Sequence, residues 1–425
     1  MSQITLKTSA SAEQTASSPL AWLSRAGFGV IILLAIALFG WANPVFLTVD
    51  NWANLLQGSA ILLIVAMAMT LIVSAGAIDL SVGVALDFGA AFALVALKTS
   101  ASAEQTASSS LAWLSRAGFG VITLLAIALF GWANPVFLTV DNWANLLQGS
   151  AILLIVAMAM TLIVSAGAID LSVGVALDFG AAFALVALKT WHLPWQAAVG
   201  CALLGGVLIG LLNAFLILIC RIRPFLATLG TWFIASSAER IYTDGGGAIA
   251  YRRMAPEYHD LAVGNLGGIP TPVAIVLALW LAAWLVTERT LWGKYVRAIG
   301  QNSEAARIAG IRDRLTMLGV LVTASALCAV GGVILSSNLR QFTPLAGQSY
   351  LMDAIAAVFI GTAFNRLGRV SILGTLGGVL FLAIIDNGLN LMGLNYLVKD
   401  ALVGVILVVA LALSFWQARL RQTHR

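Results

Sequence analysis

The segment ERTLWGKYVRAIGQNSEAARIAGIRDR, residues 288–314, is a polar stretch between two strongly apolar ones. Six of its residues are Arg or Lys, although only 10% of the whole chain is charged. Charge gathered between apolar runs is typical of a cytoplasmic connection between two membrane spans. The segment therefore indicates a membrane protein with a large basic loop on its cytoplasmic side.

Inside this loop the sequence predicts a short capped helix. Asn302 or Ser303 can cap its N-terminus, Glu304 suits the positive end of its dipole, and Gly310 can end it. Its small apolar residues share one face at helical spacing: Ala305, Ile308 and Ala309. An ordinary charged connection is the simpler interpretation, but a loop that only joined two spans could be shorter. We expect a partner outside the membrane to dock here.

Composition assigns the chain to a broad class. Hydrophobic residues make up 60% of it and the mean hydropathy is +0.97, against an apolar share of roughly 45–50% in soluble domains. Its repeated apolar runs of roughly 17–25 residues are each long enough to cross a bilayer as a helix. Because a spanning backbone must satisfy its own hydrogen bonds, we predict an all-α, polytopic helical membrane protein.

The charge and the cysteine content argue against other classes. A net charge of +5 and a pI near 9.3 agree with basic cytoplasmic loops and give no reason to expect nucleic acid as a partner. The three cysteines have no metal-type spacing: Cys201, Cys220 and Cys328. No metal site is therefore expected.

Residues 7–99 and 98–190 are nearly the same sequence at an offset of 91. The two differences are Pro19, which becomes Ser110, and Ile32, which becomes Thr123. Such near-identity is unlike the degenerate repeats of solenoids and favours a recent tandem duplication or an artefact of assembly. Each copy carries three apolar runs: 26–42, 59–76 and 84–97 in the first, and 117–133, 150–167 and 175–188 in the second.

Three extra spans would invert the topology of everything that follows, so the charge of the later loops tests the arrangement. Later spans are expected at 195–220, 224–241, 271–287, 315–336, 351–365, 371–394 and 400–416. If the second copy provides the first three spans, thirteen basic residues of the later segments face the cytoplasm and six face the other side. We therefore expect two domains, a surplus copy at 1–97 and a complete unit of about ten spans at 98–425.

The few polar residues inside the expected spans are candidates for a solute path. Asp178 is an ionisable group inside a span, and Asn387 and Asn390 lie three positions apart on one helix face. Asp170 and Ser172 predict instead a tight cytoplasmic turn, with Asp170 as the cap of the next helix. Glycines four positions apart predict close helix contacts: Gly206 with Gly210, and Gly374 with Gly378.

Motifs for catalysis or nucleotide binding are missing from the sequence. No G-x-x-x-x-G-K-[ST] segment occurs, because Gly293-Lys294 is followed by Tyr295. Patterns of the HExxH, GxSxG and Cys-x-x-Cys kinds are absent too. The chain is therefore not expected to be an enzyme or to hold a cofactor of its own.

Several segments resemble the permease subunits of bacterial ABC importers for ribose, xylose, galactose and related small solutes. They are MTLIVSAGAIDLSVG at 160–174, PFLATLG at 224–230, WGKYVRAIGQNSEAARIAGI at 292–311, LMDAIAAVFIG at 351–361, GTLGG at 374–378 and NGLNL at 387–391. The resemblance covers about residues 118–416, and the first copy has no counterpart in it. Three places depart from the family's pattern: Ser236-Ser237, 367–370 and Asp386.

The resemblance implies that the 288–314 loop seats on a separate ATPase subunit and passes its closing motion to the spans. In this chain the coupling role falls on Arg297, Gly300, Asn302, Glu304, Ala305, Ala306, Arg307 and Gly310. The implied partners are an ATPase subunit that binds the ATP, a periplasmic solute-binding protein, a second permease subunit and membrane lipid, all at the bacterial inner membrane. The candidate path residues are Asp178, Asn213, Phe225, Thr228, Asn387 and Asn390.

These features leave more than one function open. The first is an importer permease for a small polar solute, with a sugar favoured because the spans carry amides and no basic cluster for an anion. The second is an ion-coupled secondary transporter, in which Asp178 or Asp386 would couple protons or ions. A third is that the extra copy makes the chain a misassembled product. Dependence on an ATPase separates the first two.

Overall fold

The computed structural model describes residues 19–74, 114–364, 369–393 and 404. The chain divides into two compact units, Met1–Ser108 and Ser109–Arg425. The expected boundary between residues 97 and 98 lies outside the described residues and stays a prediction.

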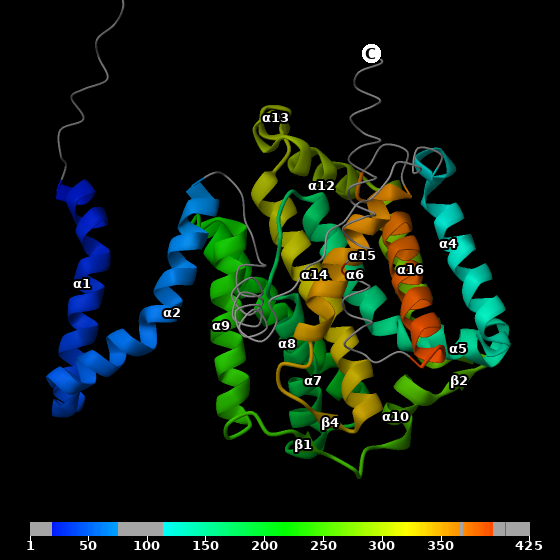
Figure 1. Ribbon diagram of the computed structural model, residues 1–425, viewed down its shortest axis with the longest axis horizontal. Helices are drawn as coiled ribbons and strands as arrows, with labels where there is room; N and C mark the ends of the chain where they lie inside the picture. The colour runs from blue at the N-terminus through cyan, green and yellow to red at the C-terminus, as the bar shows by residue number, and fades with distance from the viewer. Residues whose placement is uncertain (1–18, 75–113, 365–368, 394–403, 405–425) are drawn as a thin grey trace, which may run out of the picture. The chain divides into compact units, whose positions relative to one another are not determined.

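In the described part of the first unit, residues 19–74, helices α1 (Pro19–Ala42) and α2 (Val49–Ser74) are joined by a short 3-10 helix, η1 (Pro44–Leu47) (Figure 1). Asn43 begins the connection, since its side-chain oxygen accepts a 3.0 Å hydrogen bond from the amide of Val45. Large apolar side chains of both helices are exposed, among them Leu33, Trp41 and Met67. Apolar surface of this extent is typical of a segment that contacts lipid or another apolar partner.

The second unit begins with the second copy of the repeat. Its elements are α4 (Leu114–Ala133), η2 (Pro135–Leu138), α5 (Val140–Gly149) and α6 (Ala151–Ser165). The turn before η2 has the same backbone as that before η1: Asn134 has φ −146° and ψ 110°, and Asn43 has φ −147° and ψ 108°. An Asn followed by Pro therefore sets this turn through local bonds, because it forms alike in both copies.

The remaining elements are almost all helices. In chain order they are α7 (Val173–Lys189), α8 (Trp195–Ala214), η3 (Phe215–Ile219), α9 (Pro224–Tyr242), β1 (Ile249–Ala250), α10 (Pro256–Val263), β2 (Asn265–Leu266), β3 (Ile269–Pro270), α11 (Thr271–Arg289), α12 (Leu291–Gln301), α13 (Ser303–Ile308), α14 (Asp313–Leu339), β4 (Gln341–Phe342), α15 (Gln348–Ala363) and α16 (Ile372–Leu391). The strands form two antiparallel pairs, β1 with β4 and β2 with β3. The all-α prediction is confirmed for the described residues.

Helix α14 lies at the centre of the second unit and packs against α6, α7 and α8. Glycines of α8 allow the close approach. A Cβ on Gly206 would meet the carbonyl oxygen of Ser325 on α14, and one on Gly210 would meet that of Leu321. The contact predicted from this glycine pair is confirmed.

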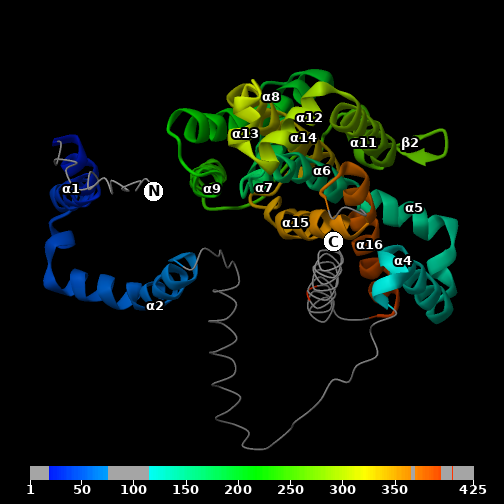
Figure 2. The ribbon, with the colours of Figure 1, turned by 90° about the horizontal axis from the view of Figure 1, so that it is seen from above.

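Helices α15 and α16 form a second close pair. A Cβ on Gly374 would run into the backbone of Gly361, and one on Gly378 would overlap the carbonyl oxygen of Ala357. This glycine pair therefore also makes the predicted contact. On its other side α16 contacts α4, so that it lies between α4 and α15 (Figure 2).

Five described helical segments are long and apolar enough to cross a membrane: Val140–Ser165, Trp195–Ile219, Thr271–Arg289, Asp313–Leu339 and Ile372–Leu391. Helices α7, α9 and α15 coincide with three more of the expected spans but are shorter or more polar, and α4, of 20 residues, coincides with the expected span 117–133. The last expected span, 400–416, lies outside the described residues except for Gly404. The multi-pass helical prediction is confirmed, and the count of ten stays a prediction.

The second unit has two distinct ends. Figure 1 shows α12 and α13 at one end, here called the α13 end, and β1, β4, β2 and α10 at the opposite strand end. At the strand end, the hydroxyl groups of Tyr258 and Ser336 are 2.8 Å apart and bury a hydrogen bond between α10 and α14. Helix α6 runs from the strand end toward the α13 end and so connects the two.

Candidate functional site

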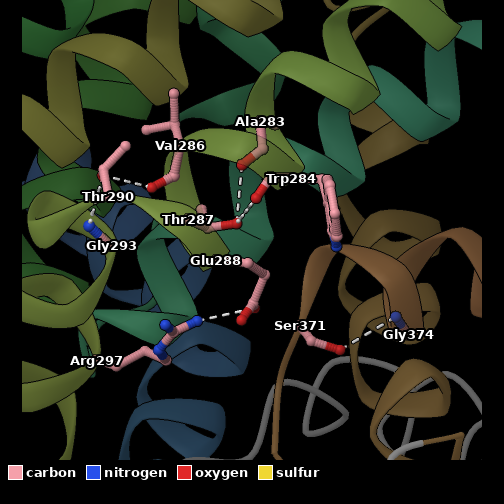
Figure 3. A network of polar contacts seen from close by, with 10 residues as sticks. All are labelled: Ala283, Trp284, Val286, Thr287, Glu288, Thr290, Gly293, Arg297, Ser371 and Gly374. Carbon is pink, nitrogen blue, oxygen red and sulfur yellow. Dashed lines mark hydrogen bonds and ion pairs between the residues drawn. The ribbon is translucent and has the colours of Figure 1, made fainter.

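The basic segment 288–314 is mostly helical, whereas the sequence predicted only one short helix in it. Helix α12 turns off α11 at a tight corner (Figure 3). The hydroxyl of Thr290 donates to the carbonyl of Val286 (2.6 Å) and accepts from the amide of Gly293 (3.4 Å). A Cβ on Gly293 would overlap the backbone of Thr287, so only glycine fits this corner.

An ion pair braces the same corner. The guanidinium of Arg297 on α12 lies 2.8 Å from the carboxylate of Glu288 at the end of α11 (Figure 3). Beside it, the guanidinium of Arg289 lies 5.3 Å from the ring centroid of Trp284. Half-exposed pairs of this kind contribute about 0–1 kcal/mol. Their consequence here is geometric, because they fix the direction of α12.

The capped helix predicted after Asn302 is present as α13. The side-chain oxygen of Asn302 accepts hydrogen bonds from the amides of Glu304 (3.1 Å) and Ala305 (2.9 Å). Gly310 has a φ of +83°, which favours glycine and ends the helix. The choice left open between Asn302 and Ser303 is thus decided in favour of Asn302.

Helix α13 projects an apolar knob from a charged setting. Ala306 is buried against the rest of the unit, whereas Ile308 is 83% exposed. An exposed ion pair of 3.6 Å joins Glu304 to Arg307 on the same short helix. The residues predicted to form the knob are all exposed: Ala305, Ile308 and Ala309.

The end of α12 rests directly on the end of α6. A Cβ on Gly300 would overlap the carbonyl oxygen of Ser165, and one on Gly167 would lie 3.1 Å from the Cα of Gly300. Gly167 also has a φ of +80°. Backbone therefore touches backbone, and a movement of α12 cannot be absorbed by a flexible side chain at this contact.

Residues 166–172, between α6 and α7, form an irregular and mostly buried segment. The carboxylate of Asp170 accepts hydrogen bonds from both the amide and the hydroxyl of Ser172, each 2.6 Å long. The expected cap is corrected, because Ser172 and not Asp170 occupies the N-cap position of α7. Asp170 is 1% exposed, so the turn is buried, and its expected position on the cytoplasmic side stays a prediction. The sequence missed this because an Asp-x-Ser turn has the same local pattern on a surface and in a core.

Two later helices complete this buried polar cluster. The side-chain amide of Asn213 on α8 donates to Asp170 (3.2 Å) and to the hydroxyl of Ser172 (2.7 Å). The hydroxyl of Thr228 on α9 accepts from the amide of Leu171 (3.1 Å). We call Asp170, Ser172, Asn213 and Thr228 the polar cluster. It joins the irregular segment to α8 and α9.

Asp178, on α7, is not part of the polar cluster and contacts the segment before α15. Its carboxylate accepts from the amide of Gly347, at 2.8 and 3.1 Å, just before α15. A second buried carboxylate, that of Glu239 on α9, accepts from the amide of Leu345 at 2.8 Å. The two acids hold the start of α15 from two sides. Glu239 was missed, although a charge inside the expected span 224–241 could have indicated it.

A cavity of about 470 Å³ lies between α5, α6, α15 and α16. Asn387 and Asn390, both predicted path residues, line it. Asn387 also exchanges two hydrogen bonds with Asn142 on α5, of 2.9 and 3.0 Å. Polar lining residues that were not assigned to the path from the sequence are Asn145, Ser150, Tyr350, Asp353 and Asp386.

The six predicted path residues therefore do not line one cavity. Asn213 and Thr228 meet in the polar cluster, Asn387 and Asn390 meet at the cavity, and Asp178 holds α15. Phe225 packs against the apolar core, and its carbonyl accepts a 3.2 Å hydrogen bond from the hydroxyl of Thr228. Their assignment to a solute path stays a prediction.

Comparison with known proteins places these features in a family. Residues 142–411 match the family described as branched-chain amino acid transport system / permease component. The ribose import permease protein RbsC of Escherichia coli K12 is 32% identical over 302 residues, which is 70% of this chain and 93% of the relative. A comparison with the solved structures found no match.

Two further relatives are import permeases as well. The autoinducer 2 import system permease protein LsrD of Photorhabdus laumondii is 31% identical over 292 residues, covering 68% of this chain and 87% of the relative. The fructose import permease protein FrcC of Rhizobium meliloti is 30% identical over 303 residues, covering 70% and 84%. The chain therefore belongs to the branched-chain amino acid transport system permease family and is a multi-pass permease subunit of an ABC importer.

Proposed function

We propose that the chain forms the membrane path for a small polar solute, a sugar, and that a separate ATPase subunit drives it from the cytoplasm. The observation that carries this proposal is α13, a rigid capped helix with an exposed apolar knob outside the apolar spans. The 83% exposed Ile308, next to Arg307, offers an apolar side chain that a protein partner can bury.

The contacts supply a route from that partner to the spans. The Glu288–Arg297 pair and the Gly293 corner fix α12 to α11, and Gly300 rests on the backbone of Ser165. Ser165 adjoins the irregular segment 166–172, whose Asp170 belongs to the polar cluster. A push on α13 is thereby transmitted to a place where the helical run is interrupted, and an interrupted span is a common moving part of transporters.

The other components follow from an importer of this type. A periplasmic solute-binding protein delivers the solute, a second permease subunit, identical or different, completes the path, and the ATPase subunit binds the ATP. The sequence has no G-x-x-x-x-G-K-[ST] motif, which suits a chain that leaves ATP to a partner. The relatives named for ribose and fructose support a sugar as solute. We place the assembly in the bacterial inner membrane.

The test is reconstitution of the chain with its ATPase subunit and solute-binding protein in liposomes. We expect ATP-dependent uptake that ionophores leave unchanged. Ile308→Asp should abolish capture of the ATPase, because a carboxylate would be buried in the docking surface. Leu266→Asp is the matched control, since Leu266 in β2 is an exposed aliphatic residue at the strand end. Equal loss in both variants would contradict docking at α13.

An ion-coupled secondary transporter is the second candidate, and the buried carboxylates of Asp178 and Glu239 are the observation that favours it. Both carboxylates accept hydrogen bonds from backbone amides at the start of α15, which is a structural use of them. Uptake by the purified chain alone, driven by a proton or sodium gradient, would establish this alternative and exclude the first.

A further inference from the structure

The buried side-chain polar atoms that lack a hydrogen-bond partner within the described residues all lie on α8 or α9. They are Asn213 Oδ1, Thr231 Oγ1, Ser236 Oγ and Glu239 Oε1. Each of these residues is at most 5% exposed, and each of the atoms is an oxygen. Because nearly all buried polar atoms in proteins are paired, their concentration at one helix indicates a partner of another kind, water or an ion.

Two of these oxygens are neighbours on α9. Ser236 and Glu239 lie three positions apart, which places their side chains next to each other on the helix surface. Their oxygens form no hydrogen bond with each other, so a single proton shared between them does not pair both. A ligand that sits between the two oxygens can contact both.

The surroundings of Glu239 are negatively charged. Its second oxygen accepts from the amide of Leu345, and the buried carboxylate of Asp178 on α7 accepts from the amide of Gly347, each at 2.8 Å. These two amides are two residues apart, so the chain separates them by at most about 7 Å. Two buried carboxylates therefore meet one short stretch of backbone.

Neither carboxylate has a basic partner in contact. Within the described residues no Lys, Arg or His forms an ion pair with Asp178 or Glu239. Arg240, the next residue on α9, attracts Glu239 electrostatically but is exposed and beyond ion-pairing distance. Burial of charge without compensation is costly, so a positive species is needed at this place.

The available oxygens favour an alkali cation. Carboxylate and hydroxyl oxygens are ligands of hard cations. The part of the chain that the structure describes has no group of three or more His, Cys, Asp or Glu side chains that could hold a metal, which argues against a transition metal. One unpaired carboxylate oxygen also suits a monovalent ion better than Ca²⁺, which takes about 6–8 oxygen ligands.

The other two unpaired oxygens extend the polar surface toward the polar cluster. Thr228 of that cluster and Glu239 lie eleven positions apart, about three helical turns, and so share one face of α9. Thr231 lies between them, and Asn213 belongs to the polar cluster itself. Oxygen atoms thus line the interface of α9 from the polar cluster to Glu239.

We propose that Glu239 and Ser236, with the charge of Asp178 beside them, bind one monovalent cation, Na⁺ or K⁺, which holds α9 against the segment before α15. Ser236 lies at a place where the sequence departs from the family's pattern, so the site is a property of this chain. The proposal goes beyond the importer function and does not depend on it, because cation binding is measured on the purified chain.

The test is thermal unfolding of the full chain in detergent, in NaCl, KCl or N-methyl-D-glucamine chloride at equal ionic strength. A cation that binds only the folded chain raises the midpoint with the logarithm of its concentration. We expect roughly 2 °C for each tenfold increase of Na⁺ or K⁺ above its Kd. Equilibrium binding of labelled ²²Na⁺ or ⁸⁶Rb⁺, an analogue of K⁺, should reach about one ion per chain.

Two variants remove the ligands singly. Glu239→Gln should abolish the cation-dependent shift, whereas its midpoint in N-methyl-D-glucamine chloride should equal or exceed that of the wild type, because the buried charge is gone. A residue with only a structural role would lower the midpoint in every salt. Ser236→Ala should move the shift to about tenfold higher cation concentration, which corresponds to about 1.4 kcal/mol of binding energy.

Matched controls come from exposed residues of the same kinds. Ser237→Ala changes the exposed neighbour of Ser236, and Glu257→Gln changes an exposed acid of α10. Both should keep the cation-dependent shift of the wild type.

The outcomes decide the proposal. Equal midpoints of the wild type in all three salts would overturn it, since protons would then neutralise the buried acids. A full shift that persists in Glu239→Gln would overturn it too, because the ion would bind elsewhere. A shift that is lost in Glu239→Gln and kept in both controls supports the site. Failure of ATP-dependent uptake would overturn the importer function and leave this result unaffected.

Discussion

The side-chain amides of Asn142 and Asn387 exchange two hydrogen bonds, of 2.9 and 3.0 Å, across 245 positions of sequence. Each amide serves as donor and as acceptor, so the pair satisfies both polar atoms that face each other. Through it, α5 of the second copy is held against α16. The first copy carries the same residue as Asn51, in a different environment.

This duplication offers an internal control for the pair. Asn142→Ala should lower the free energy of unfolding by about 0.5–1.5 kcal/mol, because the half-buried amide of Asn387 loses its partner. Asn51→Ala is the same change in the same local sequence and should have a much smaller effect. Thermal unfolding of both variants in detergent measures the difference. Equal destabilisation would show that the effect is local and that the pair contributes nothing.

The contact between Gly300 and Ser165 predicts a coupling variant. Gly300→Ala places a methyl group on the carbonyl of Ser165, so α12 must move away from α6. We expect the ATPase to assemble and to keep its basal rate while solute no longer stimulates it. Gly200→Ala is the control, because a Cβ on Gly200 meets nothing within 4 Å. The measurement is ATP hydrolysis with and without the loaded binding protein; normal stimulation in Gly300→Ala would refute this coupling route.

The cap of α13 predicts a graded loss of docking. Removal of the side chain in Asn302→Ala costs a helix about 0.5–2 kcal/mol, so α13 should fray and bind the ATPase roughly two- to thirtyfold less tightly. Ser303→Ala changes the neighbouring exposed residue and should leave binding as it was. Titration of the purified ATPase onto the permease in nanodiscs measures both. An unchanged affinity in Asn302→Ala would mean that an ordered α13 is not required.

The hydrogen bond between Asp170 and Asn213 in the polar cluster predicts that exchanging the two side chains restores stability lost in a single variant. In Asp170→Asn, an amide group replaces the oxygen that accepts from Asn213, so two donors face each other and stability should fall by about 1–3 kcal/mol. The double variant Asp170→Asn/Asn213→Asp restores one donor and one acceptor and should recover part of that loss. Thermal unfolding of the four proteins of this cycle gives the coupling energy. Additive losses would show that the two side chains do not interact.

The surplus copy predicts that a chain shortened to residues 98–425 is sufficient. We expect it to assemble with the ATPase and binding protein and to show solute-stimulated hydrolysis equal to that of the full chain. Copurification and hydrolysis rates of both chains are the measurements. Assembly by the full chain alone would make residues 1–97 a structural part and would require the ten-span topology to be redrawn.

The structural features predicted correctly from the sequence are those that depend on neighbouring residues alone. The cap at Asn302 and the end at Gly310 need only their neighbours, and the glycine pair of α8 needs only an apolar helix to pack against. The cap of α7 was assigned wrongly to Asp170, and the burial of its turn was not predicted, because that burial depends on α8 and α9, which come later in the chain. Asn142 gave no signal at all, since its partner is far away in sequence.

The cavity illustrates the same limit. Asn387 and Asn390 could be placed on one helix face from their spacing, and the structure puts both at the cavity. Asn145 and Tyr350 line the same cavity because α5 and α15 pack beside α16. The hydrophobic periodicity of the sequence does not predict which helices pack together. Polar residues within apolar helices correctly indicated candidates for the cavity lining. They did not indicate which of these candidates lie next to one another in the structure.

The near-identity of the two copies has a consequence for how the chain chooses its own partners during folding. Helix α16 is contacted by Phe130, Asn134 and Asn142 of the second copy. The first copy supplies identical residues at the corresponding positions, Phe39, Asn43 and Asn51. The side chains at these three positions therefore cannot tell the two segments apart when α16 is synthesised. At these contacts the distinction comes from the connectivity of the chain, through the cost of closing a longer loop, and that cost grows slowly with length.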